Sequence, residues 1–374
     1  MPQERDDSYG LAPGSSTREI PVPSLPYQPA DPRAWRPLIG LIGCGGISIQ
    51  HLRAYRAAGY RVAMLCDRRE ERAREAQAKF YPEAQVCTDF RDVLRRQDIE
   101  VVDLAAHPEQ RATMYAPAIE AGKHILSQKP FVTDIDFGLR IVDQADRKGV
   151  RIAVNQNGRW APHWSWIRHA IGAGLLGQVT SVRTAVNWDH NWVAGSVFDS
   201  VEPLILYDFG IHWFDITTAF LAPRKARRVF ASTAHAPSQK ARPPLLAQAV
   251  VEYEDAQAEL FFDANTLFGE QDATFVSGTR AAASSIGASL NAQAVTLSTA
   301  DGRATPTLEG QWFPDGFHGT MGELLRAVEE KRQPHHGARE NLASLELCFA
   351  AIESAARHEP VVPGTVRTLK VTMP

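Results

Sequence analysis

The sequence has little cysteine and no marked excess of charge of either sign. Its 374 residues include 4 cysteines, with no C-x-x-C pair and no spacing typical of a metal site. The formal net charge is −3, so the chain lacks the basic field that nucleic acid or an anionic membrane surface requires. These absences argue against such partners and favour a small molecule.

Long apolar runs are also missing. No run approaches the roughly 20 residues of a membrane-spanning helix. The polar, acidic start of the chain does not show the basic and apolar regions of a secretory signal. The cysteines are expected to be reduced and mostly buried. We therefore expect a cytoplasmic protein, and a chain of this length suits two domains.

From Pro37 onward, strand-like and helix-like segments alternate with short joints. Residues 38–42 form a short continuous apolar run, which is typical of a strand covered on both faces. This alternation predicts a parallel, doubly wound sheet of the α/β class, a Rossmann dinucleotide-binding domain over residues 34–155. Beyond it, successive longer strands predict an α+β domain with a large, mostly antiparallel sheet over residues 156–374. Residues 1–33 are rich in proline and are expected to form an extended or disordered arm.

A glycine-rich turn follows the first predicted strand. The run Gly43-Cys44-Gly45-Gly46-Ile47-Ser48 departs from G-x-G-x-x-G only at its last position. Gly43 allows the tight turn and Gly45 lets the backbone approach a pyrophosphate. The helix expected from about Ile49 supplies free N–H groups and a positive dipole end. Because a strand and a helix bracket the turn, we predict that Gly43, Gly45, Gly46 and Ile47 bind a dinucleotide.

An acidic residue ends the second predicted strand. Asp67 lies about 20 residues after the glycine turn, where a carboxylate accepts hydrogen bonds from the adenosine ribose. This position favours NAD. Arg68 and Arg69 follow at once and could pair a 2′-phosphate, so NADP remains open.

Two further motifs, together with the glycine turn, produce a family resemblance. One is Ala121-Gly122-Lys123-His124 leading into Gln128-Lys129-Pro130, and the other is Asp208-Phe209-Gly210-Ile211-His212 followed by Asp215. With these motifs and this domain order, the chain resembles the Gfo/Idh/MocA oxidoreductases, the family of glucose–fructose oxidoreductase and inositol dehydrogenase, over about residues 36–362. The resemblance implies an NAD(P)-dependent dehydrogenase of sugars, cyclitols or glycosides.

The same motifs suggest the chemistry. Lys129 follows a parallel strand at its carboxyl end, where open α/β sheets bind ligands. Asp208 and His212 share one face if a helix begins at or just before Asp208. By the resemblance, His212 is the acid/base, Lys129 polarises the oxygen or relays a proton, and Asp208 binds a substrate hydroxyl. The residues alone also allow Asp208 to be a helix cap and His212 an ordinary helix histidine.

The chain departs from the family pattern at two loops. Gln128 stands where the family has glutamate, which keeps hydrogen bonding but removes a charge beside Lys129. Ala106-His107-Pro108 replaces the usual Thr-Pro-Asn, which puts the nicotinamide contacts of that loop in doubt. His107, Gln128 and Lys129 are nevertheless predicted to contact the cofactor.

Aromatic and polar side chains gather where the second domain should meet the cofactor. Flat rings suit the apolar face of a sugar, and neighbouring polar groups suit its hydroxyls. Besides Lys129, Asp208 and His212, the predicted substrate contacts are Asn157, Arg159, Trp160 and Trp188. No metal is expected, because His335 and His336 are adjacent and are interpreted as a solvated loop pair.

The sequence therefore predicts reversible oxidation of a secondary alcohol on a sugar, cyclitol or glycoside. One alternative is glycoside cleavage or elimination through transient oxidation, with the cofactor recycled. Another is a nucleotide-sensing protein without catalysis. The resemblance also implies a homodimer or homotetramer, and an N-terminal arm that wraps a neighbouring subunit.

Overall fold

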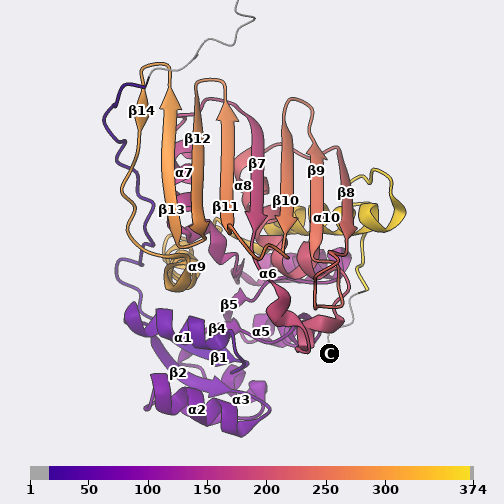
Figure 1. Ribbon diagram of the computed structural model, residues 1–374. Helices are drawn as coiled ribbons and strands as arrows, with labels where there is room; N and C mark the ends of the chain where they lie inside the picture. The colour runs from indigo at the N-terminus through magenta and orange to yellow at the C-terminus, as the bar shows by residue number, and fades with distance from the viewer. Residues whose placement is uncertain (1–16, 371–374) are drawn as a thin grey trace, which may run out of the picture.

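The computed structural model describes residues 17–370, which form two sheets with helices around them (Figure 1). The first sheet is parallel throughout, in the order β3-β2-β1-β4-β5-β6. This confirms the predicted Rossmann fold. Its strands are β1 (Leu38–Ile42), β2 (Arg61–Cys66), β3 (Gln85–Cys87), β4 (Ile99–Leu104), β5 (His124–Ser127) and β6 (Ile152–Val154).

The helices between these strands follow local sequence signals. Asp89 and Asp134 cap α3 and α6 through their side chains. Two short helices, α4 and α5, lie between β4 and β5 in place of one continuous helix. Pro117 lacks the N–H that an uninterrupted helix would direct to Thr113, which explains the break. The helices are α1 (Ser48–Ala57), α2 (Glu70–Phe80), α3 (Phe90–Arg95), α4 (Pro108–Ala112), α5 (Tyr115–Glu120) and α6 (Ile135–Lys148).

The second sheet has the order β14-β13-β12-β11-β7-β10-β9-β8, and only β7 and β10 pair in parallel. The predicted large, mostly antiparallel sheet is therefore confirmed. β12 was not predicted, because its alanine and serine residues give no clear apolar alternation. The strands are β7 (Val179–Asn187), β8 (Arg228–Ala234), β9 (Leu246–Glu252), β10 (Gln257–Asp263), β11 (Gln271–Gly278), β12 (Ala281–Ser289), β13 (Ala292–Thr299) and β14 (Arg303–Ala304).

Three helices cover one face of the second sheet, and its other face lies open in Figure 1. They are α7 (Pro162–Gly172), α8 (Ile211–Leu221) and α10 (Ala338–Arg357). The fourth late helix, α9 (Trp312–Glu329), packs Phe317 and Met321 into the core of the first sheet, beside Leu41. The domain boundary at residue 155 therefore stays a prediction, because α9, which lies far beyond it in the sequence, packs onto the first sheet. No helix among the described residues is long and apolar enough to cross a membrane.

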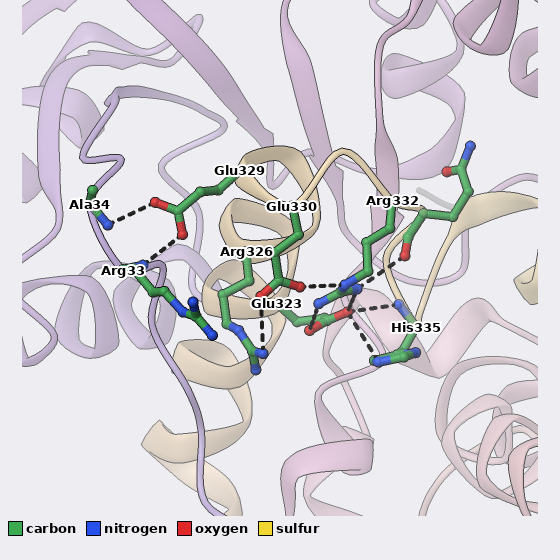
Figure 2. Close-up of polar contacts among 9 residues, drawn as sticks. Arg33, Ala34, Glu323, Arg326, Glu329, Glu330, Arg332 and His335 are labelled. Atoms are coloured by element: carbon green, nitrogen blue, oxygen red, sulfur yellow. Dashed lines mark hydrogen bonds and ion pairs between the residues drawn. The ribbon is translucent and has the colours of Figure 1, made fainter.

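The described part of the N-terminal arm lies extended along its own chain. Ile20 donates its N–H to the Arg303 carbonyl at 2.9 Å, which attaches the arm to the edge of the second sheet. Farther along, the Glu329 carboxylate accepts backbone N–H groups of Arg33, Ala34 and Trp35, each at 2.7 Å. These donors lower the pKa of Glu329. Figure 2 shows the contacts of Glu329 with Arg33 and Ala34. The part of the predicted arm over residues 1–16 lies outside the described residues.

Candidate functional site

A cavity of about 1440 Å³ opens where the carboxyl ends of the first sheet's strands face the second sheet. The residues that line it include the glycine turn near the start of the chain and residues from the middle of the chain. Most of the predicted site residues line it, and they come from both sheets and their connections. These residues are Gly43, Gly45, Gly46, Ile47, Asp67, Arg68, His107, Gln128, Lys129, Asn157, Trp188, Asp208 and His212.

The glycine turn has the geometry of a phosphate cradle. Gly43 has φ +99°, and a Cβ there would lie 2.8 Å from the Ala106 backbone nitrogen, so only glycine fits without strain. Gly45 and Gly46 have open space where a Cβ would project, so a ligand can approach the backbone closely. The Asp67 carboxylate accepts the Cys44 N–H at 2.8 Å, which fixes it beside the turn. These residues fit a dinucleotide.

Lys129 and Asp208 meet across the two halves of the cavity. The Lys129 Nζ donates to Asp208 Oδ1 at 3.0 Å and to the Asp208 carbonyl at 2.9 Å. Asp208 lies in a π-helical turn, η4 (Ile205–Phe209), that leads directly into α8. Such turns are frequent at functional sites. Gly210, not Asp208, is the N-cap of α8, so the aspartate holds the lysine rather than capping the helix.

His212 lies one turn after Asp208 and lines the same cavity. Burial lowers its pKa well below the ordinary value, and the Lys129 ammonium lowers it further. The ring is therefore neutral near pH 7. Its Nδ1 is buried and has no hydrogen-bond partner within the described chain. An ordinary buried helix histidine would have its ring nitrogens hydrogen-bonded. A neutral imidazole beside an ammonium suits proton transfer.

Gln128 points away from the Lys129 ammonium and into a buried polar network. Its Nε2 lies 3.1 Å from His51 Nε2, while its Oε1 accepts the Lys129 N–H at 2.6 Å. His51 Nδ1 in turn lies 2.7 Å from Asp103 Oδ2, which also accepts the Tyr55 hydroxyl at 2.6 Å. An amide donor on Nε2 and a carboxylate at Nδ1 together select the neutral Nδ1–H tautomer of His51. The network thus fixes the backbone at Lys129.

The sequence analysis predicted neither this network nor the buried cation Arg111. An aspartate inside the apolar run of β4 was the available signal for the network, because a buried carboxylate needs partners. Arg111 is fully buried and donates to the carbonyls of Ala106 and Pro130. It therefore holds together the loops after β4 and β5. Its place on α4 resembled an ordinary helix position, so no pattern marked it.

Three predictions need correction. Arg159 does not line the cavity, because its guanidinium is buried against Asp215, with Nε 2.6 Å from Oδ2. Trp160 is also buried outside the cavity, with its ring against His336. His336 is itself buried, so it is not part of a solvated loop pair. Each prediction failed because partners distant in sequence cover these side chains.

Several apolar and aromatic lining residues were not predicted. They come from the turn before α8, the start of α9 and the connections around the second sheet. Sequence patterns gave no sign that these segments converge. The residues are Val197, Phe198, Phe209, Leu290, Trp312 and Phe313. Trp192 and Trp213, which belong to the aromatic side chains expected where the second domain meets the cofactor, also line the cavity.

Comparison with known proteins agrees with this geometry. Residues 38–156 match the GFO_IDH_MocA model, described as an oxidoreductase family with an NAD-binding Rossmann fold. Residues 164–284 match the GFO/IDH/MocA C-terminal domain. Together the two models cover more than half of the chain.

Curated relatives match part of the chain. D-apiose dehydrogenase of Paraburkholderia graminis is 30% identical over 178 residues, which cover 47% of this chain and 47% of that protein. Inositol 2-dehydrogenase of Salmonella typhimurium is 27% identical over 180 residues, 47% of this chain and 52% of that protein. The matched region thus spans about half the length of these relatives.

Solved structures resemble the whole fold. An oxidoreductase from Agrobacterium radiobacter in complex with NAD+, L-tartaric acid and magnesium has a TM-score of 0.78 at 19% identity, covering 88% of this chain and 99% of that one. A levoglucosan dehydrogenase complexed with NADH has a TM-score of 0.73 at 19% identity, covering 87% and 99%. At these identities the likeness shows the fold.

Proposed function

Because the chain belongs to the GFO/IDH/MocA oxidoreductase family, we propose that it transfers a hydride between NAD and a secondary alcohol of a sugar, cyclitol or glycoside. The observation that carries this proposal is the convergence of Lys129, Asp208 and His212 on the cavity that contains the glycine turn. The relatives named as D-apiose and inositol dehydrogenases support the same substrate class. Asp67 favours NAD, and Arg68 leaves NADP possible.

His212 takes the hydroxyl proton in this scheme. Its low pKa keeps the imidazole neutral, so it is ready to accept a proton near pH 7. Nδ1 is closed off from solvent, which leaves Nε2 as the accepting atom. Bound NAD supplies the hydride acceptor when the alcohol is oxidised.

Lys129 stabilises the oxygen from which that proton leaves. Its Nζ, positioned by Asp208, places a positive charge where the alkoxide character develops. Asp208 accepts from the ammonium at one oxygen and can accept a neighbouring substrate hydroxyl at the other. In the reverse direction, the His212 imidazolium returns the proton.

A screen of sugars, cyclitols and glycosides tests the proposal. Purified protein is mixed with NAD+ or NADP+, and absorbance at 340 nm is followed together with keto products. The expected result is reduced cofactor in equal amount to a keto product. Product without reduced cofactor would support the recycling alternative instead, and binding of NAD without turnover of any alcohol would support a sensing role.

We also propose a homodimer or homotetramer formed through the open face of the second sheet. Five large apolar side chains are exposed on neighbouring strands of this face: Phe230, Val250, Phe261, Phe275 and Ile286. An exposed apolar patch of this kind marks an interaction surface. Light scattering should give a mass of at least two chains, and Phe261→Arg with Val250→Lys should reduce it. An unchanged mass would contradict this interface.

A further inference from the structure

The mouth of the cavity is apolar and unusually open to solvent. Trp192 is 59% exposed, Val197 54% and Phe313 40%, and all three line the cavity. Exposed apolar side chains cost free energy unless a partner covers them, and a cavity rim marks where that partner binds. The depth of the same cavity holds the polar groups Lys129 and His212. The substrate half thus combines a polar floor with an apolar entrance.

The exposed tryptophan lies on a segment that is fastened in place. This segment follows β7, and its polar side chains bind the rest of the second sheet. The Asn191 amide donates to Asp189 at 2.7 Å and to Asn265 at 2.8 Å. Asp199 accepts the backbone N–H of Arg242 at 2.7 Å. Because both ends of the segment are anchored, the indole is held at the entrance rather than left there by a loose loop.

A continuous row of aromatic rings joins the entrance to the acid/base. Successive ring centroids lie within the range in which aromatic side chains interact. The steps are Trp192–His190 at 5.2 Å, His190–Phe209 at 3.8 Å, Phe209–Trp188 at 6.2 Å, Trp188–Trp213 at 6.0 Å, Trp213–Trp312 at 5.9 Å and Trp312–His212 at 5.4 Å. Most of these rings meet edge to face, so the row is interlocked packing, and all of its members except His190 line the cavity and give it apolar surface.

In the part of the chain that the structure describes, the substrate half of the cavity has no charged side chain that lacks a partner of opposite charge. Among the lining residues from position 157 onward within the described chain, Asp208 alone has a formal charge, and it pairs with Lys129. A carboxylate or phosphate on the substrate would therefore lose its hydration without gaining an unpaired cation. This electrostatic balance favours a neutral substrate over a sugar acid or a sugar phosphate.

We propose that the cavity takes a neutral glycoside whose aglycone is planar and apolar. The sugar ring lies between Lys129 and His212, and the aglycone stacks against Trp192. This inference rests on the proposed function and narrows its substrate class. It explains why an anchored segment presents large apolar side chains to solvent at the entrance of an otherwise polar site.

Equilibrium binding to the NADH-loaded protein tests this subsite without requiring turnover. Calorimetry compares matched phenyl and methyl β-glycosides of glucose, galactose and xylose. In at least one pair, the phenyl glycoside should bind roughly tenfold or more tightly than the methyl glycoside. Phenyl glucuronide should bind at least about tenfold more weakly than phenyl glucoside, because its carboxylate finds no counter-charge. Equal affinities within every pair, or no binding of any glycoside, would overturn the proposal.

Variants then locate the effect. Trp192→Ala should abolish the phenyl preference, while Trp192→Phe should retain most of it because a flat ring remains. Phe268→Ala is the matched control, since Phe268 is 89% exposed but does not line the cavity. A phenyl preference unchanged in Trp192→Ala would contradict the assigned subsite.

The two proposals can fail separately. Phenyl preference in binding, with no NADH formed from any alcohol and NAD+, leaves the subsite intact and refutes the proposed function. NADH formation from glycosides without phenyl preference refutes the subsite and leaves the proposed function intact.

Discussion

The two ends of the cavity are built in different ways. The cofactor end is built from segments that follow strands of the first sheet, where Gly43, Gly45 and Asp67 lie in a short stretch of sequence. The substrate end consists of side chains from distant elements, such as Trp188 after β7 and Trp312 at the start of α9. Lys129 and Asp208 join the two ends by an ion pair. A general cofactor is thus held by local structure, and the substrate by tertiary packing.

The largest effect on turnover should come from substitution of Lys129 and His212, which lie where the two ends of the cavity meet. Lys129→Ala and His212→Ala should each lower kcat by roughly 10²–10⁴-fold, because charge stabilisation or proton transfer is lost. NADH binding by His212→Ala, followed by calorimetry, should change by less than about threefold, because His212 is not among the predicted cofactor contacts. Wild-type turnover in both variants would refute the assigned roles, and equal loss of NADH binding would erase the distinction between the two ends.

Substitution of Gln128 tests how the buried polar network positions Lys129 between the two ends of the cavity. Gln128→Met removes the acceptor for the Lys129 N–H and should lower kcat by roughly tenfold to a hundredfold through misplacement. Gln128→Glu keeps that acceptor and replaces only the amide donor to His51. Its kcat should therefore stay within about fivefold of the wild type, because the Lys129 N–H keeps its acceptor. A kcat of Gln128→Glu as low as that of Gln128→Met would contradict the network.

Acid should lower the stability of the folded protein through a buried histidine of α7. Burial lowers the pKa of His163 to about 3, whereas an unfolded chain titrates near 6.5. Above pH 6.5 both states are neutral, and below it only the unfolded state gains the proton. The free energy of unfolding should therefore fall by about 2 kcal/mol between pH 7 and pH 5 from this residue. Urea unfolding of His163→Gln should show a smaller dependence on pH, and an equal slope would contradict this account.

The smallest effect should come from the cofactor end. Asp67→Ala removes the carboxylate expected at the adenosine ribose and should raise the KM for NAD roughly tenfold. The kcat at saturating cofactor and the KM for the alcohol should stay within about twofold. A large fall in kcat would show that the two ends are coupled more tightly than their construction suggests.

The same contrast explains how much the sequence could predict. The parallel sheet, the glycine turn, Asp67 and the carboxyl-end position of Lys129 follow from local periodicity and spacing, and the structure places them together. Arg159 and Trp160 were misassigned because their surroundings depend on chain segments far away in sequence. Local patterns carry no information on which distant surface will cover a side chain.

The helix α9 shows a related limit. Its apolar residues predict a buried helix, but it packs against the first sheet, whose last strand in the sequence ends at Val154. Trp312 and Phe313 enter the cavity only because this helix crosses over to that sheet. The sequence could therefore predict aromatic side chains near the cofactor, but not that Trp312 and Phe313 would be among them.

The most direct measurement of the central claim is the stoichiometry of oxidation. The glycoside that binds the NADH-loaded protein most tightly is incubated with the wild-type protein and NAD+, and both NADH and keto product are quantified. Hydride transfer at the Lys129–His212 junction predicts one NADH for each keto product, with both absent in the double variant Lys129→Ala/His212→Ala. Product without NADH, or NADH formed equally by the double variant, would contradict the account.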